Sequence, residues 1–462
     1  MPKCNNRFSL KALAAAVSAT VALGVVALPT LSHADETACS PFTPLIKGQE
    51  DLVYVWTLGV EGIGDGSDKL VTVDVRPGSK TFGKVINSLS VGGRGEAHHM
   101  GFSDDRRYMW AGALDSNKMF VFDIGTDPSK PKLVRTITDL VEKTGYVGPH
   151  TFYALPGRMM IQALSNAKDH GGVTGIAVYS NDGKFISKHD MPTTKVGGVQ
   201  GDGYGYDIGI NPQKNVLLTS SFTGWNNYMM DLGKMVKDPD AMKHFGNTMA
   251  IWNLKTMEPT KVFDVPGAPL EVRWSLKKGD NWAVTATALT SQLYVIKQDK
   301  KGEWQAHDVG TIGNPADIPL PVDISITADG KGLWVNTFMD GMTRYWDFHD
   351  PMHPKEVFKE KIGSQVNMVS QSFDGKRVYY TTSLLGNWDK KGKDDEQFLK
   401  MYKWNGKKLS HVFTIDFYKE KLGRAHHMKF QALNLSKLKP LAAAESQDLD
   451  SLKLALTEPK GK

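Results

Sequence analysis

The chain has 462 residues, of which 40% are hydrophobic, 10% aromatic and 23% charged, as in a large globular protein. Its formal net charge of +6 falls to +3 once residues 1–34 are removed, because Lys3, Arg7 and Lys11 lie there and no Asp or Glu does. No basic stripe alternates with aromatic residues, so nucleic acid is excluded as an expected partner.

Residues 1–34 have the pattern of a secretory signal peptide. A basic start is followed by the apolar run ALAAAVSATVALGVVAL at 12–28 and by small residues at Ser32 and Ala34. An uncleaved anchor helix stays the alternative, although cleavage after Ala34 is favoured. No later run is apolar enough to span a bilayer. We therefore expect a periplasmic protein without stable membrane insertion after cleavage. The sequence leaves its oligomeric state open, a homo-oligomer included.

Cysteine chemistry is limited by number. The chain has two cysteines, and Cys4 would leave with the signal. Cys39, in an N-terminal arm at 35–50, then stands alone, so no intramolecular disulfide and no cysteine-ligated haem, iron–sulfur or zinc site can form. Cys39 is kept as a candidate catalytic residue that handles sulfur, and a free thiol in a mobile arm fits equally well.

Seven units of short alternating strands follow one another over residues 51–432. They begin at residues 51, 98, 150, 206, 270, 322 and 367. A spacing of roughly 45–65 residues is typical of four-stranded propeller blades with insertions. Stacked blades bury both faces of each sheet, and ring closure leaves only short edges. We predict an all-β, seven-bladed β-propeller closed by the C-terminal strand, rather than a β-sandwich pair or a solenoid. A tail of unknown structure follows at 433–462.

The tetrapeptide Ala-His-His-Met occurs twice. It contains His98 and His99 in one copy and His426 and His427 in the other. The first strand of each propeller blade lines the channel, so closure would bring the two pairs together, with His150 at the matching place in another blade. Imidazole is the commonest protein ligand of copper, zinc, nickel and iron, which predicts a metal centre. Because strand neighbours point to opposite faces, one histidine of each pair should reach the metal, unless the strand end is frayed.

Three acidic residues also begin predicted inner strands. Asp207, Glu271 and Asp323 are candidate catalytic residues for proton transfer, although carboxylates that bind backbone amides at blade starts are the simpler interpretation. Tryptophan and methionine are mostly interpreted as blade core. The remaining mature histidines are interpreted as loop or outer-strand residues: His170, His189, His244, His307, His349, His353 and His411.

Five longer segments can be compared with known families: DKLVTVDVRPGSKTFGKVINSLSVGGRGEAHHMGF, FVFDIGTDPSKPKLVRTI, GPHTF, SFDGKRVYYTTSLLGNWD and AHHMKF. In this order they resemble the selenium-binding protein family, especially its bacterial members that oxidise methanethiol. The resemblance covers approximately residues 39–430.

The resemblance implies a periplasmic, copper-dependent oxidase that converts methanethiol, O₂ and water into formaldehyde, hydrogen sulfide and hydrogen peroxide. The copper ligands it implies are His98, His99, His150 and His426. His427 is a further candidate metal ligand, and its role stays open because animal members carry an acidic residue there. Animal members also have a first-blade cysteine linked to selenium binding, which the matching stretch VYVWTLGV lacks, so selenium binding is not inferred.

Two other functions fit the same fold. A non-redox, lactonase-like propeller hydrolase would hold a hard cation with oxygen ligands. The residues available for it are Asp207, Glu271, Asp323 and Asn367. A binding scaffold would use the histidines only to store or carry copper or selenium. Metal identity separates the hydrolase from the oxidase, and turnover with O₂ separates the scaffold from it.

Overall fold

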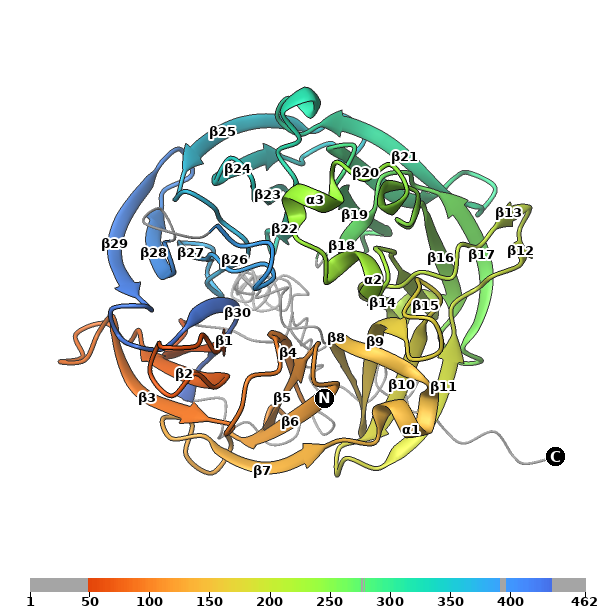
Figure 1. Ribbon diagram of the computed structural model, residues 1–462. Helices are drawn as coiled ribbons and strands as arrows, with labels where there is room; N and C mark the ends of the chain where they lie inside the picture. Colours follow the sequence, from red (N-terminus) through yellow and green to blue (C-terminus); the bar gives the residue numbers. More distant parts are fainter. Residues whose placement is uncertain (1–48, 276, 278, 391–395, 434–462) are drawn as a thin grey trace, which may run out of the picture.

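The computed structural model describes residues 49–275, 277, 279–390 and 396–433. Seven four-stranded sheets surround a central axis (Figure 1). The prediction of an all-β, seven-bladed propeller is therefore confirmed. The predicted signal peptide, Cys39 and the tail from residue 434 onwards lie outside the described residues.

Each blade is an antiparallel sheet of four strands that lie side by side in order from the axis to the rim. The first four blades contain β30 (Arg424–Gln431), β1 (Leu52–Leu58), β2 (Lys69–Asp74) and β3 (Lys84–Ser90); β4 (Ala97–Phe102), β5 (Tyr108–Ala113), β6 (Lys118–Asp123) and β7 (Lys132–Ile137); β8 (Tyr146–Leu155), β9 (Arg158–Asn166), β10 (Gly175–Ser180) and β11 (Phe185–Asp190); and β14 (Ile208–Asn211), β15 (Val216–Thr219), β16 (Thr248–Asn253) and β17 (Glu258–Asp264). The last three contain β18 (Pro269–Trp274), β19 (Trp282–Thr287), β20 (Gln292–Gln298) and β21 (Trp304–Thr311); β22 (Pro321–Ile326), β23 (Gly332–Thr337), β24 (Met342–Asp347) and β25 (Lys355–Lys361); and β26 (Val369–Gln371), β27 (Arg377–Thr381), β28 (Phe398–Trp404) and β29 (Leu409–Asp416).

The C-terminal strand closes the ring. β30 is the innermost strand of the blade that holds β1, β2 and β3, and it pairs antiparallel with β1, with Val55 opposite Met428. The backbone of Asp51 extends this pairing by donating to the carbonyl of Gln431 at 2.8 Å. Chain segments far apart in sequence therefore share one sheet, which brings the second histidine pair to the axis.

The apolar core lies between neighbouring blades. Trp56 of β1 packs against Phe120 and Phe122 of the next blade, with ring centroids 5.8 Å away in both cases. Its indole nitrogen donates to the carbonyl of Gly112 at 2.8 Å. Outer strands such as β11 alternate between partly buried and exposed residues. Two-sided burial of the inner strands is why a single blade could not fold alone.

Short helical elements occur only in connections between the described strands. They are α1 (Leu140–Thr144), η2 (Pro212–Lys214), α2 (Trp225–Tyr228), α3 (Leu232–Met235), η3 (Ala241–Lys243) and η4 (Pro315–Asp317). A small two-stranded sheet consists of β12 (Lys195–Val196) and β13 (Val199–Gln200). Across the described ranges, no helix combines the length and apolar character needed to cross a membrane.

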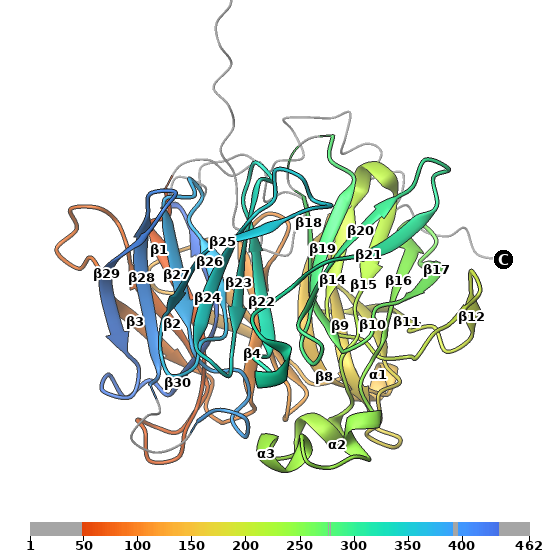
Figure 2. The same cartoon turned by 90° about the horizontal axis from the view of Figure 1, so that it is seen from above.

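Two insertions, residues 220–247 and 382–390, form what we call the cap. The first carries α2 and α3, which lie at one end of the ring (Figure 2). The side chain of Asn387 joins the two insertions by donating to the carbonyls of Tyr228 (2.9 Å) and Met230 (2.6 Å). Apolar cap residues pack with residues at the starts of several inner strands. The cap therefore covers one mouth of the central channel.

Candidate metal centre

A β-bulge turns both histidines of the first pair toward the channel. The pairing of β4 with β5 shifts between Ala97 and Met100, so His98 and His99 together face one residue of β5. Their rings stack with centroids 4.9 Å apart and planes 11° from parallel. The expectation that only one histidine of the pair reaches the centre, which assumed a regular strand, is therefore wrong.

A β-bulge also occurs in β8 and β30, the other two inner strands that carry histidines of the cluster. In β8 the register shifts between Pro149 and Thr151, which makes His150 the extra residue. In β30 the shift leaves His426 as the extra residue beside His427. Bulges re-aim side chains without ending the strand, so three blades deliver histidines to one point.

These bulges follow backbone positions of unusual conformation. Residues in the left-handed region precede the shifts in five inner strands by two or three positions: Glu96 (φ 63°), Gly148 (φ 70°), Ala268 (φ 61°), Leu320 (φ 58°) and Gly423 (φ 102°). Three of the five are not glycine, and such residues rarely adopt this region without a structural reason. The channel end of the blades is thus shaped by backbone strain as well as by side chains.

Five histidines form one buried cluster, and each is at most 4% exposed. Ring centroids are 3.9 Å apart for His98 and His426, 4.0 Å for His99 and His150, and 4.5 Å for His99 and His427. Ligand-capable atoms of His98, His99 and His150 all lie within 4.8 Å of one another. These three form the compact part of the cluster, and the closing strand supplies the other two.

Unpartnered nitrogens in this cluster fit a metal. His150 Nδ1 lies 2.9 Å from the carbonyl of Tyr206; as the donor of that bond it leaves Nε2 with its lone pair. His150 Nε2, His426 Nε2 and His98 Nδ1 have no hydrogen-bond partner although they are buried. Buried polar atoms without partners cost about 1–3 kcal/mol each. A cation ligated by imidazoles would remove that cost.

His427 has a different role. Its Nδ1 accepts a hydrogen bond from the backbone N–H of Met100 at 3.0 Å, so its neutral ring carries hydrogen on Nε2. This nitrogen offers no lone pair to a metal. His427 instead ties the closing strand to β4 next to His99, which gives a positioning role to a residue whose function the sequence left open.

Burial keeps the imidazoles uncharged. It lowers the pKa of His150 and His426 from 6.5 to about 3. The pKa values of His98, His99 and His427 are also well below 6.5, because of burial first. Repulsion between protonated rings this close together lowers them further, and Lys429 adds to this at His427. Neutral imidazole is the form that binds metal ions, so the cluster has the correct protonation state at neutral pH.

Two of the three acidic candidates bind backbone amides. Asp207 accepts from the N–H groups of Ile208 (2.8 Å) and Val272 (2.7 Å). Asp323 accepts from those of Ile324 (2.9 Å) and Val369 (2.7 Å). Both carboxylates link one blade to the next, as the simpler interpretation expected.

Glu271 is the acidic candidate that reaches the histidines. Its Oε2 pairs with Arg273 at 2.8 Å, whereas its buried Oε1 has no hydrogen bond and lies 3.8 Å from His99 Nε2. Burial raises the pKa of Glu271 well above 4.5, and the charges of Asp207 and Asp323 raise it further. A carboxyl group whose protonated form is favoured by burial therefore lies beside a candidate metal ligand.

Arg273 occupies the position between the carboxylates where the hydrolase alternative would place its cation. Its guanidinium contacts Asp207 at 2.9 Å, Glu271 at 2.8 Å and Asp323 at 3.3 Å. The amide of Asn367, the fourth proposed ligand, donates to the carbonyl of Ser383 at 2.6 Å. Carboxylates that are bound to one arginine do not form an open oxygen cage for a hard cation, so the donor set favours nitrogen ligation.

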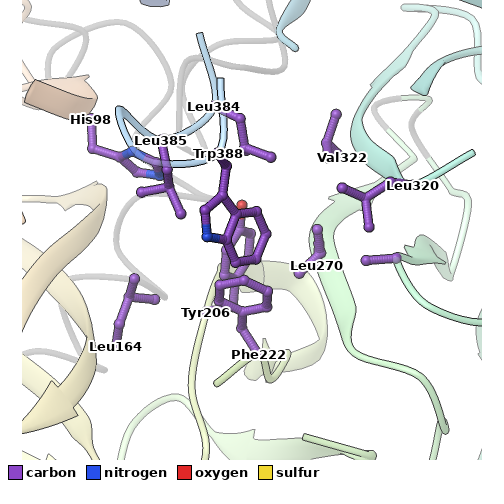
Figure 3. A pocket seen from close by; sticks show the side chains of 11 residues that line it. His98, Leu164, Tyr206, Phe222, Leu270, Leu320, Val322, Leu384, Leu385 and Trp388 are labelled. Carbon is purple, nitrogen blue, oxygen red and sulfur yellow. The ribbon is translucent and has the colours of Figure 1, made fainter. Parts of the chain in front are cut away.

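An apolar pocket adjoins the cluster at His98 (Figure 3). Its volume is about 20 Å³, and its walls come from blade starts and from the cap. They include Tyr206, Phe222, Leu270, Leu320, Leu385 and Trp388. The sequence assigned no role to the cap residues, although Leu385 and Trp388 lie in the family segment SFDGKRVYYTTSLLGNWD. Tryptophan is interpreted from the sequence as mostly blade core, and Trp388 is an exception. Loops have no periodicity that would have revealed this role.

Comparisons with known proteins agree with this architecture. Residues 32–436 match the model of the family described as 56kDa selenium binding protein (SBP56). A Hyphomicrobium sp. protein named methanethiol oxidase is 68% identical over 413 residues, which are 89% of this chain and 94% of that protein. A protein of the same name from Ruegeria pomeroyi is 59% identical over 411 residues, covering 87% and 94%.

Solved structures support the fold. A hypothetical selenium-binding protein from Sulfolobus tokodaii superposes with a TM-score of 0.72 at 24% identity, covering 86% of this chain and 97% of that one. A periplasmic gluconolactonase from Pseudomonas aeruginosa gives 0.57 at 13% identity, covering 84% and 100%, a likeness of fold alone. The resemblance inferred from the five sequence segments is confirmed, and the chain belongs to the selenium-binding protein family.

Proposed function

We propose that the chain is a copper-dependent methanethiol oxidase, which converts one methanethiol, one O₂ and one water into one formaldehyde, one hydrogen sulfide and one hydrogen peroxide. The identity to methanethiol oxidases extends over 89% of the chain. The observation that carries the proposal is the set of unpartnered, uncharged histidine nitrogens beside a small apolar pocket.

His98, His99 and His150 are the proposed copper ligands, with His426 completing the set. Copper would supply affinity for a soft thiolate and one-electron exchange with O₂. Zinc has no redox chemistry and would not supply the electron exchange. The carbonyl of Tyr206 fixes the His150 ring, and His427 holds β4 in place through Met100. Such supporting bonds orient ligands toward a metal.

Glu271 is the group best placed to hold a proton near the reacting sulfur. Its Oε1 is 3.8 Å from His99 Nε2 and has no other bond. A thiol that binds a metal loses its proton, and a neighbouring carboxyl can take part in that transfer. Asp207 and Asp323 are poorly placed for this role, because backbone amides occupy their oxygens.

The proposal is tested by measuring bound metal by mass spectrometry and O₂ uptake with methanethiol on the same purified sample. We expect near-stoichiometric copper and equal amounts of formaldehyde, sulfide and peroxide. Copper without thiol-dependent O₂ uptake would instead make the chain a binding scaffold. Bound calcium and no O₂ uptake, even after copper loading, would favour the hydrolase alternative instead.

Export is a separate part of the proposal. The signal pattern at 1–34 predicts a periplasmic mature protein that begins at Asp35. N-terminal sequencing of protein from the periplasmic fraction checks this. A protein found only in the cytoplasm with residues 1–34 attached would contradict it.

A further inference from the structure

The pocket beside the histidine cluster has an almost wholly apolar lining. His98 lies on one side and Leu320 on the other, with the Trp388 indole between them (Figure 3). Apart from His98, the walls are leucine, valine, alanine and aromatic side chains. A ligand group inside the pocket contacts apolar side chains and the imidazole ring of His98, a proposed metal ligand. The pocket therefore suits the hydrocarbon part of a molecule whose polar atom is held at the histidines.

The volume limits what can enter. About 20 Å³ is room for roughly one or two groups of the size of a water molecule. A methyl group next to a sulfur atom fits, whereas a propyl chain does not fit without displacement of a wall. A hydroxyl or ammonium group would be buried without a partner along the apolar walls, away from His98 and Tyr206, and would be disfavoured there for that reason.

Hydrogen bonds hold the cap wall in place. The Trp388 indole donates to the carbonyl of Met230 at 3.0 Å. On either side of Leu385, the backbone of Leu384 donates to Asp389 at 2.8 Å and that of Gly386 to Glu96 at 2.6 Å. A wall anchored at this many points does not yield easily to a longer ligand, so the size of the pocket becomes a size limit.

We propose that this pocket is the alkyl-binding subsite of the oxidase, and that Leu320 and the cap residue Leu385 restrict the substrate to methanethiol. The inference rests on the proposed function and adds the residues that set chain length. One methylene in a hydrophobic pocket changes kcat/KM by about 10- to 200-fold. The specificity constant should therefore decrease about tenfold or more from methanethiol to ethanethiol, and again to 1-propanethiol.

The test compares kcat/KM for three alkyl thiols and for 2-mercaptoethanol, which has as many heavy atoms as 1-propanethiol. Leu320→Ala lengthens the pocket away from His98, and Leu385→Ala enlarges it on the side of the cap. Both should raise the ratio of 1-propanethiol to methanethiol, Leu320→Ala by about tenfold or more, without admitting 2-mercaptoethanol. Leu293→Ala, in the core between the β18–β21 and β22–β25 blades and outside the pocket lining, is the matched control and should leave the ratio unchanged.

The opposite variant fills the pocket. Ala288 is buried and lines the cavity, so Ala288→Leu should abolish methanethiol turnover while bound copper stays unchanged. Xenon, which enters apolar cavities, gives a readout without catalysis. Crystals of metal-free protein under xenon pressure should show xenon beside His98 in the wild type and none in Ala288→Leu.

The outcomes separate the two proposals. Methanethiol turnover with equal kcat/KM for all three alkyl thiols, or an unchanged ratio in both leucine variants, would overturn the subsite alone. Xenon absent from the wild-type pocket would do the same. Failure of every thiol to support O₂ uptake would overturn the oxidase and the subsite together.

Discussion

The histidine cluster separates two regions of the channel that differ in chemistry, although adjacent residues of the same strands build both. In or directly before three inner strands, a pocket-lining residue is followed by an acidic residue that contacts Arg273 instead of the pocket. The pairs are Tyr206–Asp207, Leu270–Glu271 and Val322–Asp323. One step along the chain therefore changes an apolar surface into a charged one.

The charged region carries its own compensation. Arg273 binds three carboxylates within 3.3 Å, and Lys429 is fully buried in β30. The apolar region has no comparable group, because His98 and Tyr206 are the two titratable residues among those that line the pocket. Under the proposed function an uncharged thiol enters from the apolar side, and protons are handled on the charged side.

The largest expected effect is at the boundary between the two regions. His150→Ala removes a proposed ligand, so copper content should decrease and O₂ uptake should drop by more than about a hundredfold, the upper end of what loss of a supporting residue costs. Circular dichroism should show an intact fold. Metal analysis and O₂ uptake on the same preparation check this.

His427→Ala is the matched control for that prediction. Its ring supports β4 through Met100 instead of offering a nitrogen to the metal, so copper should be retained and activity should stay within about tenfold. Full turnover with retained metal in His150→Ala would remove His150 from the site. Equal losses in both variants would show that the two rings share one role.

A stability experiment tests how much Arg273 contributes to the charged region. Arg273→Met leaves buried carboxylates without their shared cation, which should lower the free energy of unfolding by about 3–5 kcal/mol. Urea denaturation of metal-free protein measures it. Lys184→Met, which removes a surface ion pair with Asp182, should not shift the midpoint measurably. A midpoint equally unaffected in Arg273→Met would mean that the carboxylates are not held as charges.

The fold and the meeting of the histidines could be predicted because both depend on repetition. Regular spacing of strand units predicts the blades, and closure of any such ring brings residues 98 and 426 together. The structure confirms this for His98 and His426, whose rings lie 3.9 Å apart. The argument needed only the order of strands and no knowledge of their packing.

The details of the site could not be predicted, because they depend on departures from regular structure. Strand alternation predicts that His98 and His99 diverge, whereas the bulge in β4 makes them converge. The wall formed by Leu385 and Trp388 depends on hydrogen bonds between insertions about 160 residues apart in sequence. Neither feature leaves a periodic signature in a single sequence.

The smallest predicted effect concerns the protonation of one ring in the charged region. Burial holds the pKa of His427 well below 6.5 in the folded protein, and the positive charges of Lys429 and Arg273 lower it further. The unfolded chain takes up that proton near pH 6.5 and the folded chain does not, so His427 destabilises the fold as pH falls below 6.5. Relative to His427→Gln, the metal-free wild type should lose about 1.4 kcal/mol of unfolding free energy per pH unit between pH 6 and 5. Urea titrations at several pH values measure the difference, and it should be constant above about pH 7.5, where neither state is charged. A difference independent of pH throughout would mean that His427 has the same pKa in the folded and unfolded chain and takes up its proton in the fold below pH 6.5. Its bond from the Met100 amide would then have to be reassigned.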